Sequence, residues 1–100
     1  MLFLIEHNHS PETCPTRNPD MVRALRAHVR PENAERMGLK LLADWANEPE
    51  HKVVMVVEGQ TLEAAEGFAA PFRQIGDVRV SMGLTCEEVA RSCLGESPSS

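Results

Sequence analysis

The sequence predicts an α+β domain in which a four-stranded antiparallel sheet carries helices on one face. The chain has 100 residues, 42% of them hydrophobic and 25% charged, which is ordinary for a single globular domain. Four short segments have the apolar, partly β-branched composition of strands. Two longer segments have apolar residues at helical spacing and lie after the first and the third strand. The predicted order is therefore strand, helix, strand, strand, helix, strand.

The first strand is expected at residues 2–9, because alternating positions divide its side chains between two faces. Both faces begin apolar and end polar, and one of them carries Phe3, Ile5, His7 and His9. The next segment, SPETCPTRN, has the composition of a loop. Its first residue, Ser10, is placed to cap a short turn that begins at Pro11.

The first helix is expected after Asn18, which precedes Pro19 and has the side chain of an N-cap residue. Apolar residues then keep helical spacing as far as Val29. Pro31 must kink or restart this helix, because proline has no backbone N–H to donate. Gly38 is expected to end it.

The second strand is expected at residues 39–46 and the third at 51–58, with a turn of sequence NEPE between them. The third strand, HKVVMVVE, is rich in β-branched residues, and the two strands form a hairpin. Thr61 caps a second helix that Pro71 should interrupt. The fourth strand is expected at 77–84. A capping box of Thr85 and Glu88 then opens a short third helix.

This order is that of the ferredoxin-like arrangement, in which the strands lie in the spatial order four, one, three, two. We expect one ferredoxin-like domain at residues 1–93 and a disordered polar tail at 94–100. The sheet face without helices is also apolar. We therefore expect a second copy to cover it, in a homodimer or a higher homo-oligomer.

Charge and hydropathy exclude several classes of partner. Ten Lys and Arg residues against fifteen Asp and Glu give a net charge of −5, and no basic stripe is present, so nucleic acid is not expected as a partner. No apolar run approaches the ~20 residues that cross a bilayer. The opening MLFLI lacks the basic region of a signal peptide, so we expect a cytoplasmic protein with free thiols at Cys14, Cys86 and Cys93.

Four segments, LFLIEHNH, SPETCP, HKVVMVVEG and FAAPFRQIGDVRVSMGLTCEEV, together resemble an uncharacterised prokaryotic family of ferredoxin-like proteins in the dimeric α/β-barrel superfamily. The resemblance covers about residues 1–92. It implies a fold and a homodimer but no single reaction, because that superfamily includes haem-degrading and quinol monooxygenases, muconolactone isomerases and metal-binding proteins. The family's H-x-H-x-x-x-x-C-P segment corresponds to His7, His9 and Cys14, with His51 at the start of the third strand.

The ferredoxin-like arrangement predicts that these four residues converge. The third strand lies antiparallel beside the first, so His51 should be next to His7 and His9, and the turn after Ser10 can return Cys14 to the same end of the sheet. Imidazole and thiolate groups favour zinc, iron or copper over magnesium or calcium. We therefore predict a transition-metal site formed by His7, His9, Cys14 and His51.

Two alternatives stay open at this point. One is a metal-free enzyme, similar to the monooxygenases or isomerases, in which a histidine acts as general base on a small organic molecule. The other is a structural dimer without site chemistry, in which the histidines are rim residues and Cys14 is a small buried group.

Further residues are assigned lesser roles. Glu6, Glu12 or Glu50 would supply a carboxylate ligand or orient the histidines. His28, with Arg26 and Arg30 near it, is interpreted as a solvated residue, and Cys86 and Cys93 are interpreted as packing residues.

Overall fold

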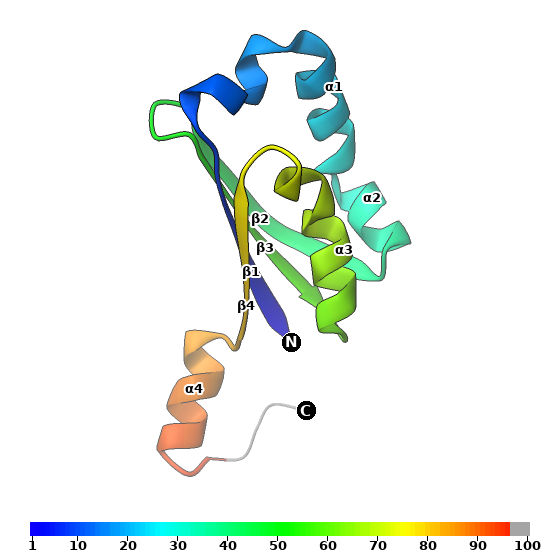
Figure 1. Cartoon of the computed structure of the whole chain (residues 1–100). Helices are drawn as coiled ribbons and strands as arrows, with labels where there is room; N and C mark the ends of the chain where they lie inside the picture. Colours follow the sequence, from blue (N-terminus) through cyan, green and yellow to red (C-terminus); the bar gives the residue numbers. More distant parts are fainter. Residues whose placement is uncertain (97–100) are drawn as a thin grey trace.

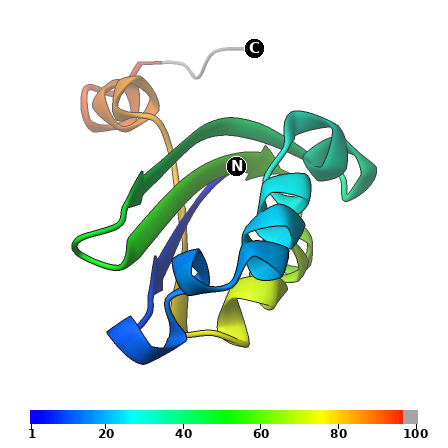
Figure 2. The same ribbon diagram turned by 90° about the horizontal axis from the view of Figure 1, so that it is seen from above.

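The computed structural model describes residues 1–96 and confirms the predicted fold class (Figures 1 and 2). Its four strands form one antiparallel sheet in the order β2-β3-β1-β4. The strands are β1 (Leu2–Asn8), β2 (Leu39–Asn47), β3 (Lys52–Gly59) and β4 (Asp77–Gly83). The helices are the 3-10 turns η1 (Pro11–Thr13) and η2 (Pro15–Arg17), followed by α1 (Pro19–His28), α2 (Pro31–Arg36), α3 (Leu62–Arg73) and α4 (Cys86–Cys93).

Three helices begin at the predicted N-caps. The side chain of Asn18 accepts hydrogen bonds from the backbone N–H groups of Asp20 and Met21 in α1, and that of Thr61 accepts one from the N–H of Ala64 in α3. Thr85 and Glu88 form the predicted capping box of α4. Pro31 restarts the chain as α2, and Gly38 then follows with a φ of 79°, a conformation that glycine adopts at no steric cost.

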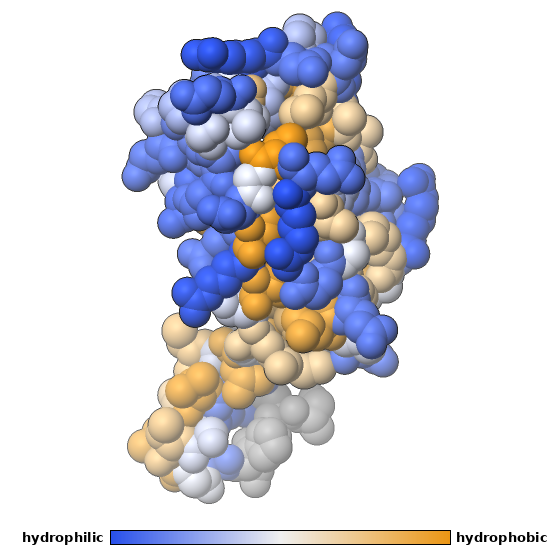
Figure 3. All heavy atoms as spheres, viewed as in Figure 1, coloured by the Kyte–Doolittle hydropathy of each residue, from blue (hydrophilic) through white to orange (hydrophobic). Residues whose placement is uncertain are grey.

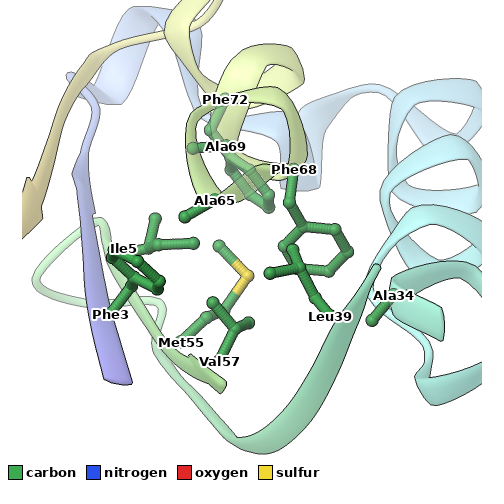
Figure 4. Packing of buried hydrophobic residues seen from close by; sticks show 10 residues of the cluster. All are labelled: Phe3, Ile5, Ala34, Leu39, Met55, Val57, Ala65, Phe68, Ala69 and Phe72. Atoms are coloured by element: carbon green, nitrogen blue, oxygen red, sulfur yellow. The ribbon is translucent and has the colours of Figure 1, made fainter. Parts of the chain in front are cut away.

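The core lies between the sheet and α3, and Figure 4 shows its side chains meeting there. Alternate residues of β1 and β3 point toward the helix, and β1 pairs with both β3 and β4 so that Ile5 lies opposite Met55 and Val80. The fully buried aliphatic and aromatic side chains include Phe3, Ile5, Met55, Val57 and Phe68. His7 continues this buried row of β1, so a polar ring ends an apolar stripe.

Three details differ from the sequence-based expectation. Pro71 does not interrupt α3, which continues to Arg73: the proline leaves the Gly67 carbonyl without its helical N–H donor, but Phe72 and other apolar residues of the helix are buried against the sheet and hold the last turn in place. His51 lies in the turn before β3 instead of on the strand. His28 is only partly exposed, because its ring stacks on Phe68 and its Nε2 lies 2.6 Å from the Phe68 carbonyl oxygen.

The face of the sheet opposite α3 has no helix over it in the described part of the chain (Figure 2). Leu4 on β1 is paired with Val56 on β3, and Trp45 on β2 with Val54. Trp45 is 49% exposed. We call these four residues the open sheet face.

Helix α4 projects beyond the sheet, away from the layer formed by α1, α2 and α3 (Figures 1 and 2). Figure 3 shows hydrophobic colours over much of its visible side, with some white and blue atoms among them. Leu84, just before α4, Val89 within it and Leu94 just after it are exposed. Cys86 and Cys93 are exposed too, so the described residues do not give them the expected packing role.

The predicted tail at 94–100 falls largely outside the described residues, which end at 96. Leu94, Gly95 and Glu96 still donate backbone hydrogen bonds to the last turns of α4. Among residues 1–96, no helix has the length and apolar character required to cross a membrane.

Candidate metal centre

The end of β1 positions the first two histidines. His7 is the last buried residue of the strand and lies opposite Val53 of β3 and Val78 of β4. His9 follows one residue after the strand, and its ring centroid is 5.0 Å from that of His7. The two side chains lie on the same side of the sheet, as the period of two predicts.

The turn between β2 and β3 positions His51. Its N–H donates to the Glu48 carbonyl, and its own carbonyl accepts a hydrogen bond from the N–H of His9 at 3.0 Å. This bond joins the turn to the end of β1. His51 has a φ of 55°, an uncommon conformation for a residue other than glycine.

The two 3-10 turns position Cys14 between them. Ser10 and Thr13 form a reciprocal capping box around η1, and Pro15 begins η2. Because the residue before a proline avoids helical backbone angles, Cys14 stays extended, with φ −60° and ψ 120°. Its thiol is buried and lies 3.0 Å from the hydroxyl oxygen of Thr16.

These elements bring together three of the four predicted site residues. One ring nitrogen each from His9 and His51 and the Sγ atom of Cys14 all lie within 4.8 Å of one another. In a tetrahedral zinc site with ordinary bond lengths, such atoms are about 3.4–3.8 Å apart. Side-chain rotations that bring these three atoms about 1 Å closer together would therefore give the spacing of a tetrahedral site.

Two ring nitrogens of this group are buried without a partner. His9 Nε2 and His51 Nδ1 make no hydrogen bond with any described residue. Leaving a buried polar atom unpaired costs about 1–3 kcal/mol. Two such atoms beside a buried thiol are an arrangement that a bound cation would satisfy.

His7 lies behind the group and contacts it through His9. Its Nε2 is 3.0 Å from Nδ1 of His9, which leaves Nε2 of His9 free to face Cys14 and His51. If Nδ1 of His9 carries the proton, that N–H donates to His7. The structure therefore places His7 next to the three-residue group, at hydrogen-bond distance from His9.

Burial favours the neutral form of His7 and His9. It lowers the pKa of His7 to about 4, helped by the neighbouring His9, while the backbone and the charge of Asp77 act in the opposite direction. The Asp77 backbone does not form a hydrogen bond of ordinary geometry with His7 Nδ1, so its opposing effect is the smaller one. The pKa of His9 is lowered as well, first by burial and then by His51. Neutral imidazole is the form that binds metal ions.

The three carboxylates considered as ligands lie outside the group. Glu6 points to the ammonium of Lys52 at 4.0 Å, and Glu50 accepts a hydrogen bond from the side chain of Asn47. Glu12 is exposed in η1, where its own backbone N–H and Ser10 lower its pKa. None of the three belongs to the described cluster of ligand atoms.

Sequence reasoning missed the contacts around the group. The contact between Thr16 and Cys14 joins two residues within one loop, and no motif signals it. Val22 and Leu25 of α1 line a cavity that includes His9 and Cys14. Their helical spacing predicted only that they face the protein interior, because spacing does not show which part of the interior they contact.

The comparisons with known proteins concern family and fold. A family model described as Domain of unknown function (DUF3303) matches residues 1–94. A comparison with curated proteins gave no match. Among solved structures, SCO4226 from Streptomyces coelicolor A3(2) is similar, with a TM-score of 0.56 and 16% sequence identity over 86% of this chain and 100% of that one. At that identity the likeness concerns the fold alone.

Proposed function

Because the chain belongs to the family described as Domain of unknown function (DUF3303), its function has to be inferred from its site, and we propose that it binds a transition metal ion through His9, Cys14 and His51. The observation that supports this proposal is the convergence of two unpaired, buried ring nitrogens with a buried thiol. Nitrogen and sulfur donors favour zinc, iron or copper. His7, expected as a fourth ligand, is assigned the role of orienting His9.

The lowered pKa values of His7 and His9 favour metal binding over general-base catalysis by these two residues. A general base works best when its pKa is near the working pH, and a pKa of about 4 makes His7 a weak base at neutral pH. A metal ligand only has to be unprotonated at neutral pH. The two functions differ in their response to chelators, because activity of a metal-free enzyme would survive them.

We also propose that the protein is a cytoplasmic homodimer of the dimeric α/β-barrel type. The open sheet face supports the dimer, since a second copy would bury Leu4, Trp45 and Val56. The free thiol of Cys14 and the exposed thiols of α4 support a reducing compartment.

Elemental analysis of the untagged protein tests the metal site. We expect about one zinc, iron or copper ion per chain, and a Cys14→Ser variant that binds the same ion more than about 100-fold more weakly. The Cys86→Ser variant is the matched control, because its thiol lies on α4 and outside the cluster, and it should bind like the unmodified protein. Equal binding by the unmodified protein and the Cys14→Ser variant would refute the metal site.

A further inference from the structure

A cavity of about 360 Å³ lies against the candidate metal centre. It is bounded by the end of β1, the turns that hold Cys14, helix α1 and the β2–β3 hairpin. His9 and Cys14 form part of its wall, so two of the three proposed ligands face it. Its volume is in the range of pockets that bind small organic molecules.

The rest of the wall is mainly apolar. Pro15, Val22, Leu25 and Val53 supply hydrocarbon surface from three different elements. The polar side chains nearby have other partners: Asn47 is bonded to Glu50, the ammonium of Lys52 lies 4.0 Å from Glu6, and Thr16 contacts Cys14. Glu48 is exposed in the turn. A molecule in the cavity would therefore meet hydrocarbon on one side and the metal centre on another.

The three protein ligands determine the net charge of the metal centre, and this charge decides whether an anionic or a neutral group binds to the ion more favourably. Two neutral imidazoles and one thiolate leave a divalent ion with a net charge of about +1. Three protein ligands also leave one position of a tetrahedral ion open, as in sites that bind small molecules. The open position is therefore suited to an anionic donor atom.

We propose that this cavity binds a small monocarboxylate, whose oxygen takes the open metal position and whose hydrocarbon chain lies against Val22, Leu25 and Val53. The inference rests on the proposed metal function and adds to it the class of ligand. The charge of the centre selects the carboxylate, and the apolar wall selects an acid with a hydrocarbon chain over a short polar one.

The experiment uses the full chain loaded with Co²⁺, which accepts the same nitrogen and sulfur donors as zinc and absorbs visible light. Acetate, butyrate and hexanoate are titrated in turn, and the visible spectrum reports a change in coordination. We expect hexanoate to bind at least about tenfold more tightly than acetate, because each methylene that leaves water strengthens binding by up to about fourfold.

A matched pair of variants localises the effect. Val22→Asn places a neutral polar group on the cavity wall and should weaken hexanoate binding by about fivefold while leaving acetate binding unchanged. Val89→Asn makes the same change on α4, at a residue of similar exposure, and should alter neither. Circular dichroism checks that both variants fold.

The outcomes separate this inference from the proposed function. If the protein binds Co²⁺ through Cys14 but acetate and hexanoate bind equally, or Val22→Asn has the effect of Val89→Asn, the ligand assignment is wrong and the metal site stands. If Co²⁺ does not bind at all, both are wrong.

Discussion

At the scale of single residues, His7 combines complete burial with a polar ring. It is fully inaccessible to solvent, contacts Phe72 at a ring distance of 5.0 Å, and gives one nitrogen to His9. A charged imidazole there would lose its hydration, so the folded protein keeps the ring neutral. The free energy of unfolding therefore depends on pH through the protonation of His7.

We predict that the metal-free protein loses stability as pH falls from about 6.5 to about 4. In this window the unfolded chain takes up a proton at His7 that the folded chain does not, so the free energy of unfolding decreases with falling pH, by up to ~3 kcal/mol. His7→Gln removes the titrating group. Urea unfolding with a chelator, followed at several pH values, should give a smaller slope for this variant, and identical slopes would contradict the assignment.

Gly76 is a second residue whose identity matters for the site. A Cβ atom placed there would lie 2.3 Å from the Asn8 carbonyl oxygen and 2.8 Å from a ring carbon of His7. Backbone cannot move away as a flexible side chain can. Only glycine therefore allows the start of β4 to lie this close to the end of β1.

We predict that Gly76→Ala lowers the free energy of unfolding by about 1–3 kcal/mol, because the methyl group displaces β1. It should also weaken metal binding, since His7 and His9 move with that strand. Gly83→Ala is the control, because a Cβ atom placed there would have nothing within 4 Å, so its stability should be unchanged or slightly higher. Chemical denaturation of both variants measures this, and equal effects would refute the contact.

At the scale of elements, the β2–β3 turn holds a strained residue at the candidate site. His51 has a positive φ of 55°, which is costly for a side chain with a Cβ atom. The hydrogen bond from His9 to its carbonyl holds this conformation. The strained backbone conformation at this turn therefore accompanies the placement of the His51 imidazole next to Cys14 and His9.

We predict that His51→Asn leaves stability unchanged or raises it by up to ~1 kcal/mol, because asparagine tolerates this backbone conformation better. The same variant should bind metal at least about 100-fold more weakly, since a ligand is missing. Thermal unfolding and metal titration are the two measurements. A variant that is much less stable, or that still binds metal normally, would show that His51 serves the turn alone.

At the scale of the whole molecule, helices α1, α2 and α3 cover one face of the sheet, and no helix within residues 1–96 covers the other (Figure 2). The described chain extends 50 × 28 × 18 Å, with α4 projecting at one end (Figure 1). A small domain buries a limited fraction of its surface by itself, and the open sheet face remains accessible. This shape is the reason for proposing a second copy.

We predict that Trp45→Lys weakens the dimer by about thirtyfold or more, because a charge would replace a large apolar side chain in the contact. Leu62→Lys is the matched control, since Leu62 is exposed to a similar degree but lies on α3. Analytical ultracentrifugation at micromolar concentration measures both. An unmodified protein that is monomeric under these conditions contradicts the proposed dimer.

Local sequence determined most of the fold. The caps at Asn18, Thr61 and Thr85 act on neighbouring backbone groups. The alternation along the first strand put His7 on the same face as Phe3 and Ile5, but only the structure shows that this face is the buried one. These signals are short-range, so they can be read without coordinates. The strand order followed from the same element order.

Only the tertiary structure decided which side chains meet and at what distance. The sequence predicted that His7, His9, Cys14 and His51 converge at one end of the sheet. The structure brings ligand atoms of His9, Cys14 and His51 within 4.8 Å of one another and places His7 behind them, at hydrogen-bond distance from His9. The approach of His51 to His9 and Cys14 depends on packing between segments distant in the sequence, including the backbone hydrogen bond from His9 to the His51 carbonyl, and local patterns do not encode it. The cavity beside Cys14 arises in the same way, because its walls come from elements that meet only in the folded chain.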